Sequence, residues 1–509
     1  MREFSSLKRV TRLVWLFIGS LVLLSLSGCI GFPTLFRNKP IPAVAASMIP
    51  QPLSTGQRQP SAQRSMGLDQ CHEIARRNNP SLASGAWDVQ TSVALRNYTA
   101  SERWPNISNA DSLRQYVQNQ RLQAATLNGE PGMFSSGILA VDILVRMPVF
   151  TGGRIRSDIS AAELTVMATE NRLARTWEEL IFNVSSSFYT ILGQRKLIES
   201  LEFSRQVLTK QRKRVQDMMS VGKSARVDVL RTEVRIADLD QRLVREKSLL
   251  EIQRRLLTTL MGVGLDGGPV YPQGGLGLGG PAPDLDGSLA MAFSERGDYR
   301  AARASLDAQA MKIRAARGAL WPKVTLDGAI GMRTATGIDD NGVAYTNRLN
   351  YSAQKAANPP PAQYPFSLLR EPWPYPDSTL PVGSMGVVAE YPIFDGGRIR
   401  SQISEQETKF ASQQQQLRKL ALQIRLDVET AIINVNSARE RVFATKKAIE
   451  QSEESFRIEQ EKYDLGKGSI TDVLDAQSAM LVAQSTYYVS LADYNIAVAQ
   501  LGMATGEKR

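Results

Sequence analysis

The stretch Gly-Gly-Arg-Ile-Arg-Ser occurs twice in this chain, at residues 152–157 and again at residues 396–401. A Pro-x-Phe triplet precedes each copy, so that Pro148 and Pro392 are equivalent positions 244 residues apart. The same offset relates Gly222-Lys223 to Gly466-Lys467, and the Asp-Val-Leu triplet at 228–230 to the one at 472–474. Solenoid units are about 20–50 residues long, so this larger period indicates two similar halves that lie side by side.

The duplication extends over nearly the whole chain beyond its N-terminal segment. Trp104-Pro105 and Trp321-Pro322 each interrupt an Ala-rich amphipathic stretch and open a strand. The first of these stretches is predicted as one helix from Leu68 to about Arg103. We therefore predict a first repeat at residues 67–264, a Gly/Pro linker at 265–286 and a second repeat at 287–509. Such a pseudo-symmetric pair suits a ring or a tube.

A long helix is predicted after each Gly-Gly pair. No proline occurs between Val149 and Gly268 or after Pro392. Apolar and small residues recur at alternating spacings of four and three, which is coiled-coil spacing, at Ile155, Ile159, Ala162, Val166, Thr169, Leu173, Thr176 and Leu180. A helix from Arg154 to about Met219 would be roughly 100 Å long at 1.5 Å per residue. A second helix should run from about Ser224 to Leu260, and the second half should repeat this pattern after Leu465-Gly466.

Strands are predicted just before the two Gly-Gly pairs, at Gly137–Phe150 and Gly386–Phe394. In the first, Val141, Ile143 and Val145 alternate with Asp142 and Arg146 among others. This period of two fits a membrane barrel strand with a polar lumen, although a soluble sheet on a core would look similar. The chain offers about four strands, too few to close a barrel, and open strand edges are excluded from hydrocarbon. If the strands enter a membrane, several chains must share one barrel.

The N-terminus has the pattern of a lipoprotein signal. Four basic residues precede a short apolar run at 13–24, which is below the roughly 20 residues that span a bilayer. Leu26-Ser27-Gly28 then precedes Cys29. This resembles a bacterial lipobox, which implies a signal peptide at 1–28, acylation of Cys29, a tether at 29–66 and sorting to the outer membrane. An uncleaved anchor helix with an incidental cysteine is the alternative.

The composition excludes several classes of function. With Cys29 assigned to lipid, Cys71 has no partner for a disulfide. His72 is the one histidine, so histidine-based metal sites and Ser-His or Cys-His catalysis are not expected. The net charge of +11 is spread among many acidic residues without a basic, aromatic-rich block, so nucleic acid is not an expected partner. We predict no enzymatic activity and no cofactor.

Taken in order, these motifs resemble those of the TolC-type outer-membrane factors. The resemblance rests on the duplication, the lipobox, the Pro-x-Phe-x-Gly-Gly-Arg junctions, Asn79-Pro80, and the segment Gly-Lys-Gly-Ser-Ile-Thr-Asp-Val-Leu-Asp at 466–475. It implies a mixed α/β membrane protein: a β-barrel contributed by several protomers continues into a long α-helical coiled-coil barrel. It also implies a homotrimer in the outer membrane that works with a periplasmic adaptor and an inner-membrane transporter.

The helix reversals are the first candidate site. Gly222 and Gly466 suit left-handed helix ends, where the chain turns back. By resemblance these turns are periplasmic tips that contact the adaptor. The tip residues are Val221, Gly222, Lys223 and Ser224, and Leu465, Gly466, Lys467 and Gly468. For the two lysines, solvation is an equal alternative to partner contact.

Asp472 and Asp475 are the second candidate site, because they lie three residues apart on one helix face just after the reversal. They are typical of helix capping, with Ser469 and Asp472 forming a capping box. By resemblance they line a closed periplasmic gate, where rings of carboxylates attract cations. Asp228 is equivalent to Asp472, but Arg231 stands where the second half has Asp475. We hypothesise an Arg231–Asp475 pair between neighbouring helices that holds the gate shut.

The strand-to-helix junctions are the third candidate site. They comprise Pro148, Gly152, Gly153 and Arg154, and Pro392, Gly396, Gly397 and Arg398. Glycines before a helix also occur in phosphate loops, but neither copy has the full pattern, and a bend explains both. Both arginines are expected near the membrane boundary.

The leading hypothesis is a passive exit duct for a tripartite efflux pump. Protein export through a type I secretion system is the alternative within the same family, and a periplasmic coiled-coil scaffold without a pore is the alternative from another class. An insertion between Gly331 and Gly383, rich in proline, has no counterpart in the first half and is predicted to form a long extracellular loop.

Overall fold

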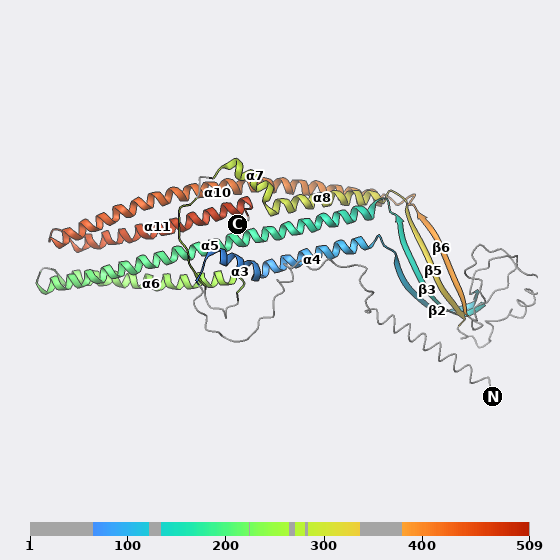
Figure 1. Cartoon of the computed structure of the whole chain (residues 1–509), viewed down its shortest axis with the longest axis horizontal. Coiled ribbons are helices and arrows are strands. Elements are labelled where there is room, and N and C mark those ends of the chain that lie inside the picture. The colour runs from blue at the N-terminus through green and yellow to red at the C-terminus, as the bar shows by residue number, and fades with distance from the viewer. Residues whose placement is uncertain are drawn as a thin grey trace, which may run out of the picture. The chain divides into compact units, whose positions relative to one another are not determined.

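Two helices of 67 residues each organise the fold, α5 (Arg154–Ser220) and α10 (Arg398–Asp464). Each turns back into a second helix, α6 (Arg226–Leu260) after α5 and α11 (Ile470–Thr505) after α10. The bounds of α5 and α10 differ by the same 244 residues that separate the Gly-Gly pairs. The predicted long helices are confirmed, and Figure 1 shows the two hairpins that they form.

These elements come from a computed structural model that describes residues 65–121, 134–222, 224–263, 270–279, 283–335 and 379–507. All of them belong to one compact unit spanning Pro52–Arg509. The predicted signal peptide, Cys29, Lys223 and most of the 331–383 insertion lie outside the described residues. None of the described helices is long and apolar enough to cross a membrane.

Four shorter helices flank the hairpins: α3 (Leu68–Asn78), α4 (Pro80–Ser101), α7 (Leu285–Glu295) and α8 (Gly297–Gly318). The single helix predicted from Leu68 to Arg103 was therefore wrong, because the chain breaks at Asn79. A residue before proline avoids the helical region, and Asn79 has extended backbone angles (φ −68°, ψ 123°). Its side chain caps the new helix by accepting from the backbone N–H of Ser81 and Leu82.

In each half, a glycine at the C-terminal end lets the last helix pack against the break between the first two helices. Gly262 and Gly506 both have left-handed backbone angles, with φ of +66° and +76°. A Cβ on Gly262 would overlap the backbone of Asn78 and Asn79, and one on Gly506 would press on the backbone of Arg296. Since only glycine permits this approach and this φ, the end of α6 packs on the α3–α4 break as the end of α11 packs on the α7–α8 break.

A four-stranded antiparallel sheet precedes the long helices. Its order is β2 (Asn106–Arg121), β3 (Phe134–Phe150), β5 (Lys323–Ala335) and β6 (Thr379–Glu390). The sheet does not close on itself among the described residues, and β2 and β6 form its edges (Figure 1). A separate short pair joins β1 (Ser65–Met66) to β4 (Tyr271–Pro272).

The register sorts the side chains of the sheet by polarity. Val141, Ile143 and Val145 of β3 lie opposite Met332, Ile330 and Gly328 of β5. The alternate positions of the same two strands carry Asp142, Arg146, Asp327 and Arg333. The predicted alternation is confirmed. The second strand was predicted to reach Phe394 but ends at Glu390, whose partner Lys323 is the first residue of β5, so no backbone partner remains beyond it.

Packing between the halves is asymmetric in this chain. Helix α5 contacts α4, α6, α8 and α11, whereas α10 contacts α7, α8 and α11. Buried side chains of α10, including Ile424, Val428, Val435 and Val442, form the apolar contacts with α7 and α11. Among the described residues neither α4 nor α6 packs along α10.

Candidate functional site

Apart from Lys223, which lies outside the described residues, the predicted tip residues lie at the ends of the two hairpins. Gly222 and Gly466 have the same left-handed φ of +74°, and a Cβ on either would meet nothing within 4 Å. Glycine is thus needed there for backbone conformation, which is the helix-ending role that the sequence indicated. The neighbouring apolar residues Val221 and Leu465 are 68% and 72% exposed. Each tip therefore presents a large apolar side chain to its surroundings.

The hairpin turns also have equivalent caps. Asp472 accepts from the backbone N–H of Ser469 at 3.3 Å at the start of α11. Asp228 accepts from the backbone N–H of Ala225 at 3.2 Å and from the Ser224 hydroxyl at 3.0 Å at the start of α6. Both carboxylates also suit the positive end of the helix dipole. Each of these two aspartates thus caps its own helix.

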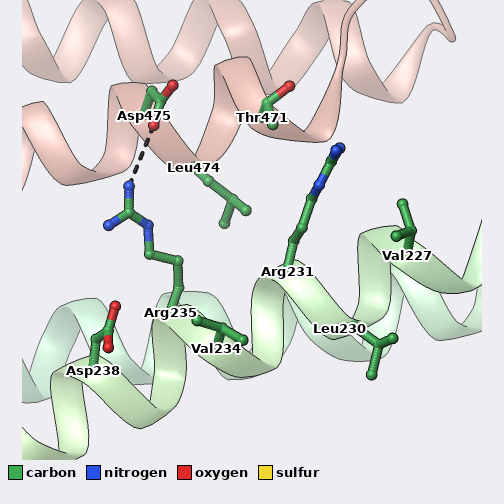
Figure 2. Close-up of a pocket in the computed structure, with 9 residues that line it drawn as sticks. All are labelled: Val227, Leu230, Arg231, Val234, Arg235, Asp238, Thr471, Leu474 and Asp475. Carbon is green, nitrogen blue, oxygen red and sulfur yellow. Dashed lines mark hydrogen bonds and ion pairs between the residues drawn. The ribbon is translucent and has the colours of Figure 1, made fainter.

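Asp475 differs, because its carboxylate points away from its own helix toward α6. The Nη2 atom of Arg235 lies 3.3 Å from its Oδ1 atom, as Figure 2 shows. Arg231 pairs instead with Asp228 on its own helix, at 3.7 Å. The predicted Arg231–Asp475 partnership is therefore wrong within this chain. The arginine one helical turn further along α6 reaches α11 at the level of Asp475.

A cavity of about 400 Å³ separates α6 from α11 around this pair. Its apolar lining comes from Val227, Leu230 and Val234 of α6 and from Leu474 of α11. Arg231 and Arg235 extend across it from α6 toward α11 (Figure 2). The two hairpins are thus held loosely here, with a polar link beside an apolar gap.

A second link between the hairpins lies nearer the tips, and the sequence did not indicate it. Arg214 of α5 donates to both carboxylate oxygens of Asp464 of α10, at 2.9 and 2.8 Å. Further along, the amide of Gln477 donates to the buried Ser204 hydroxyl. The equivalents of Arg214 and Asp464 in the other half are Ile458 and Ser220. The sequence does show that these charged residues have uncharged equivalents in the other half. That difference alone does not predict that Arg214 and Asp464 contact each other.

The first strand-to-helix junction is tightly built. Pro148 lies within β3 opposite Thr325. Gly152 has φ +61°, and a Cβ there would overlap the Gly318 carbonyl. Gly153 has φ +80° and lies in open space. Arg154 then pairs with Glu102 at 3.3 Å and with Asp158 at 3.2 Å.

The second junction has a cap that the first lacks. Asp395 accepts from the backbone N–H of Gly397 at 2.9 Å and of Ile399 at 2.8 Å. These hydrogen bonds lower the pKa of Asp395. Gly396 and Gly397 have φ of +67° and +87°, with open space around both. Arg398 begins α10, while Pro392 lies beyond the end of β6. An aspartate two residues before a Gly-Arg helix start was the signal for this cap.

A buried cluster of charges lies where α7 meets α8. Arg296 is 3% exposed and contacts Asp298 at 3.0 Å and Asp427 of α10 at 2.8 Å. Glu178 of α5 is 2% exposed, accepts from the backbone N–H of Gly297, and pairs with Arg175 at 3.3 Å. Burial raises the pKa of Glu178. The cluster joins both halves, and no motif in the sequence indicated it.

Cys71 and His72, for which the sequence predicted no disulfide, metal or catalytic role, lie close together in the chain. Cys71 is buried, which raises the pKa of its thiol to about 11. The Nε2 atom of His72 lies 2.9 Å from the Ser185 hydroxyl. Within the described ranges, no group of histidine, cysteine and carboxylate side chains could hold a metal ion.

The fold is that of solved outer-membrane channels. The outer-membrane channel OprN superposes with a TM-score of 0.68 at 18% sequence identity, over 87% of this chain and 90% of that one. The family described as outer membrane efflux protein matches residues 72–263 and 375–507, more than half of the chain. The chain belongs to this family.

Two curated relatives agree with that assignment. Outer membrane protein TolC of Escherichia coli (strain K12) is 21% identical over 427 residues, which cover 82% of this chain and 78% of TolC. Nodulation protein T of Rhizobium leguminosarum bv. trifolii is 24% identical over 290 residues, 56% of this chain. The chain matches about half the length of that protein, 54%. TolC is described as an outer membrane protein and the matching family as one of outer membrane efflux proteins, and neither description is that of an enzyme.

Proposed function

We propose that this chain is the outer-membrane exit duct of a tripartite efflux pump. Three copies would form a passive conduit, anchored by lipid on Cys29, that an adaptor and an inner-membrane transporter open at the hairpin tips. Membership of the outer membrane efflux protein family supports the efflux role. The observation that carries the proposal is the sheet, whose strands β3 and β5 carry apolar side chains on one face and charged side chains on the other, and which continues directly into long helices.

The faces of the sheet match those of a membrane barrel strand, apolar toward lipid and polar toward the lumen. On the apolar face, Ile143, Ile330 and Met385 are 51%, 73% and 80% exposed. A soluble sheet would cover such a face with a core. Because β2 and β6 have free edges, the barrel would close only when β6 of one copy pairs with β2 of the next.

The helix contacts support the same assembly, because some contacts of the second half have no equivalent for the first half within one chain. Helix α8 packs between α5 and α10, and α11 packs on both α10 and α5. The duplication predicts equivalent contacts of α4 and α6 with α10, but in the part of the chain that the structure describes neither helix packs along α10. The surfaces concerned are apolar and exposed, with Leu95 of α4 at 55%, Val244 of α6 at 69% and Ile433 of α10 at 65%. A neighbouring copy would supply each missing partner, and a head-to-tail interface of this kind closes into a ring.

The equivalence also predicts which residues meet between copies. Gly193 of α5 lies so near α11 that an added Cβ would be 2.8 Å from the Ala492 Cβ. The residues 244 positions away are Ser437 on α10 and Ser248 on α6, and both are exposed. A Ser248→Cys/Ser437→Cys variant should therefore form disulfides between copies under mild oxidation, since Cβ atoms about 3.5–4.5 Å apart permit one.

Cross-linking and conductance together test the proposal. The double-cysteine variant should give a cross-linked trimer on non-reducing electrophoresis. Each single variant, and the mismatched Ser248→Cys/Ser404→Cys pair, should not. The wild type should then form pores in planar bilayers. A trimer that never conducts would identify the non-pore scaffold, and the absence of cross-links would contradict the arrangement of helices.

Partner capture separates efflux from secretion. The exposed tip residues Val221 and Leu465 would contact helical hairpins of the adaptor. An adaptor that copurifies with a drug transporter supports efflux, whereas one that copurifies with an ATP-driven protein exporter supports type I secretion. Substitution of Leu465 by Ser should weaken adaptor capture without reducing trimer yield.

A further inference from the structure

The charged face of the sheet contains two ion pairs between β3 and β5, and they are built differently. Arg146 and Asp327 lie directly opposite each other, with the Nε atom 3.1 Å from Oδ1, and their side chains are 73% and 34% exposed. Asp142 and Arg333 lie diagonally across the strands, with Nη1 2.6 Å from Oδ1, and are only 18% and 24% exposed. The second pair is the one withdrawn from solvent.

A glycine makes the diagonal pair possible. Gly331 is the residue of β5 directly opposite Asp142. A Cβ at this position would overlap both the Asp142 Oδ1 atom and the Val141 carbonyl oxygen. The carboxylate therefore lies across the bare backbone of β5 to reach Arg333. This arrangement holds the guanidinium against the sheet and neutralises it.

We propose that Asp142 and Arg333 keep their level of the barrel lumen without an ion preference, as a balanced pair in which each charge masks the other. This inference rests on the proposed channel function. Each copy in the barrel would carry one such pair at the same level. Removal of either partner would leave a ring of unpaired charge: a ring of guanidinium groups when Asp142 is neutralised, and a ring of carboxylates when Arg333 is neutralised. Rings of charge of one sign attract ions of the opposite sign.

Reversal potentials across planar bilayers in a salt gradient test this. Asp142→Asn should shift the permeability ratio toward anions, and Arg333→Gln should shift it toward cations. We expect a shift of about twofold to threefold in each case, because moderate salt screens the few unit charges of such a ring. The double variant Asp142→Asn/Arg333→Gln should return to the wild-type ratio, because it carries no unpaired charge.

A matched control lies on the other face of the same sheet. Asp111 of β2 is exposed and lies opposite Val141, so it shares the apolar face. The Asn109 amide donates a hydrogen bond to its carboxylate at 2.8 Å. Asp111→Asn changes the charge as Asp142→Asn does, but outside the lumen. It should leave the permeability ratio unchanged.

The recordings should be made both with the native tips and in the Arg214→Ala/Arg235→Ala background. In that background a closed tip does not mask the contribution of the barrel to the permeability ratio. Trimer yield on electrophoresis confirms that each variant assembles. If both single variants form pores with the wild-type permeability ratio, this inference is overturned and the proposed channel function is not. A selectivity shift in Asp111→Asn would reverse the assignment of the faces. Trimers that form no pores at all would instead overturn the channel function.

Discussion

Arg214 and Asp464 join the two long helices near their tip ends through two hydrogen bonds, from Nη1 to Oδ1 at 2.9 Å and to Oδ2 at 2.8 Å. Both side chains are partly exposed, at 44% and 39%. Exposed ion pairs contribute about 0–1 kcal/mol to stability. This contact therefore suits a latch between the hairpins that can be released at low cost, rather than a determinant of the fold.

Removal of this latch should open the tip. We expect Arg214→Ala and Asp464→Asn each to raise the single-channel conductance of the reconstituted protein, because the two hairpins lose a direct link. The control is Arg205→Ala, which removes an ion pair between α5 and α6, inside one hairpin. Its conductance should equal that of the wild type. Equal conductance in all three variants would assign the closure of the tip to other contacts.

The arginines of α6 should differ in their effect on the gate. Arg235 pairs with Asp475 of α11, whereas Arg231 pairs with Asp228 of its own helix. We expect Arg235→Ala and Asp475→Asn to raise conductance, and Arg231→Ala to raise it less. A larger effect of Arg231→Ala than of Arg235→Ala would mean that Asp475 pairs with Arg231 once neighbouring copies assemble. That is the pair that the sequence suggested.

The buried Arg296 should be a strong determinant of stability. It is 3% exposed and contacts Asp298 and Asp427. Loss of one partner of a buried ion pair leaves an uncompensated charge and costs about 3–5 kcal/mol. We expect Arg296→Met to lower the thermal unfolding midpoint sharply. The added change Asp427→Asn should restore part of the loss, whereas two independent effects would simply add.

The cap of α10 should contribute stability that depends on pH. Hydrogen bonds from the backbone of Ile399 and Gly397 lower the pKa of Asp395 below its usual 3.8. A carboxylate with a lowered pKa in the folded state stabilises that state above its usual pKa, and the contribution is lost as the pH falls through the folded value. Wild type should thus unfold at a higher temperature than Asp395→Asn at neutral pH. The difference should narrow as the pH falls below 3.8. A constant difference would exclude the charge as its cause.

Local patterns predicted much of the fold. The heptad spacing after Arg154 and the lack of proline predicted a 67-residue helix nearly to its end. Alternation at 141–147 predicted which side chains share a face of the sheet. The helix predicted through Asn79 was wrong, since the Ala-rich pattern continues on both sides of a proline that ends one helix and begins the next.

The positions of the candidate residues and the capping contact of Ser469 with Asp472 were predicted, but the contacts between the hairpins were not. Asp475, Gly222 and Gly466 lie at the hairpin ends, as the duplication indicated. The partner of Asp475 was assigned one helical turn too early, because the relative rotation and shift of α6 and α11 depend on the packing of both hairpins. The Arg214–Asp464 contact was missed for the same reason.

The sequence alone determined the duplication, the long helices, the alternating strands and the glycines at the reversals, because these depend on contacts within a few residues or on an exact repeat of motifs. Only the tertiary structure decided which charges meet. Arg296 with Asp427, Arg235 with Asp475, and Asp142 with Arg333 across Gly331 are each far apart in the chain. Their pairing depends on how whole helices and strands are aligned, and an alignment of this kind is set by the sum of many packing contacts rather than by any short pattern.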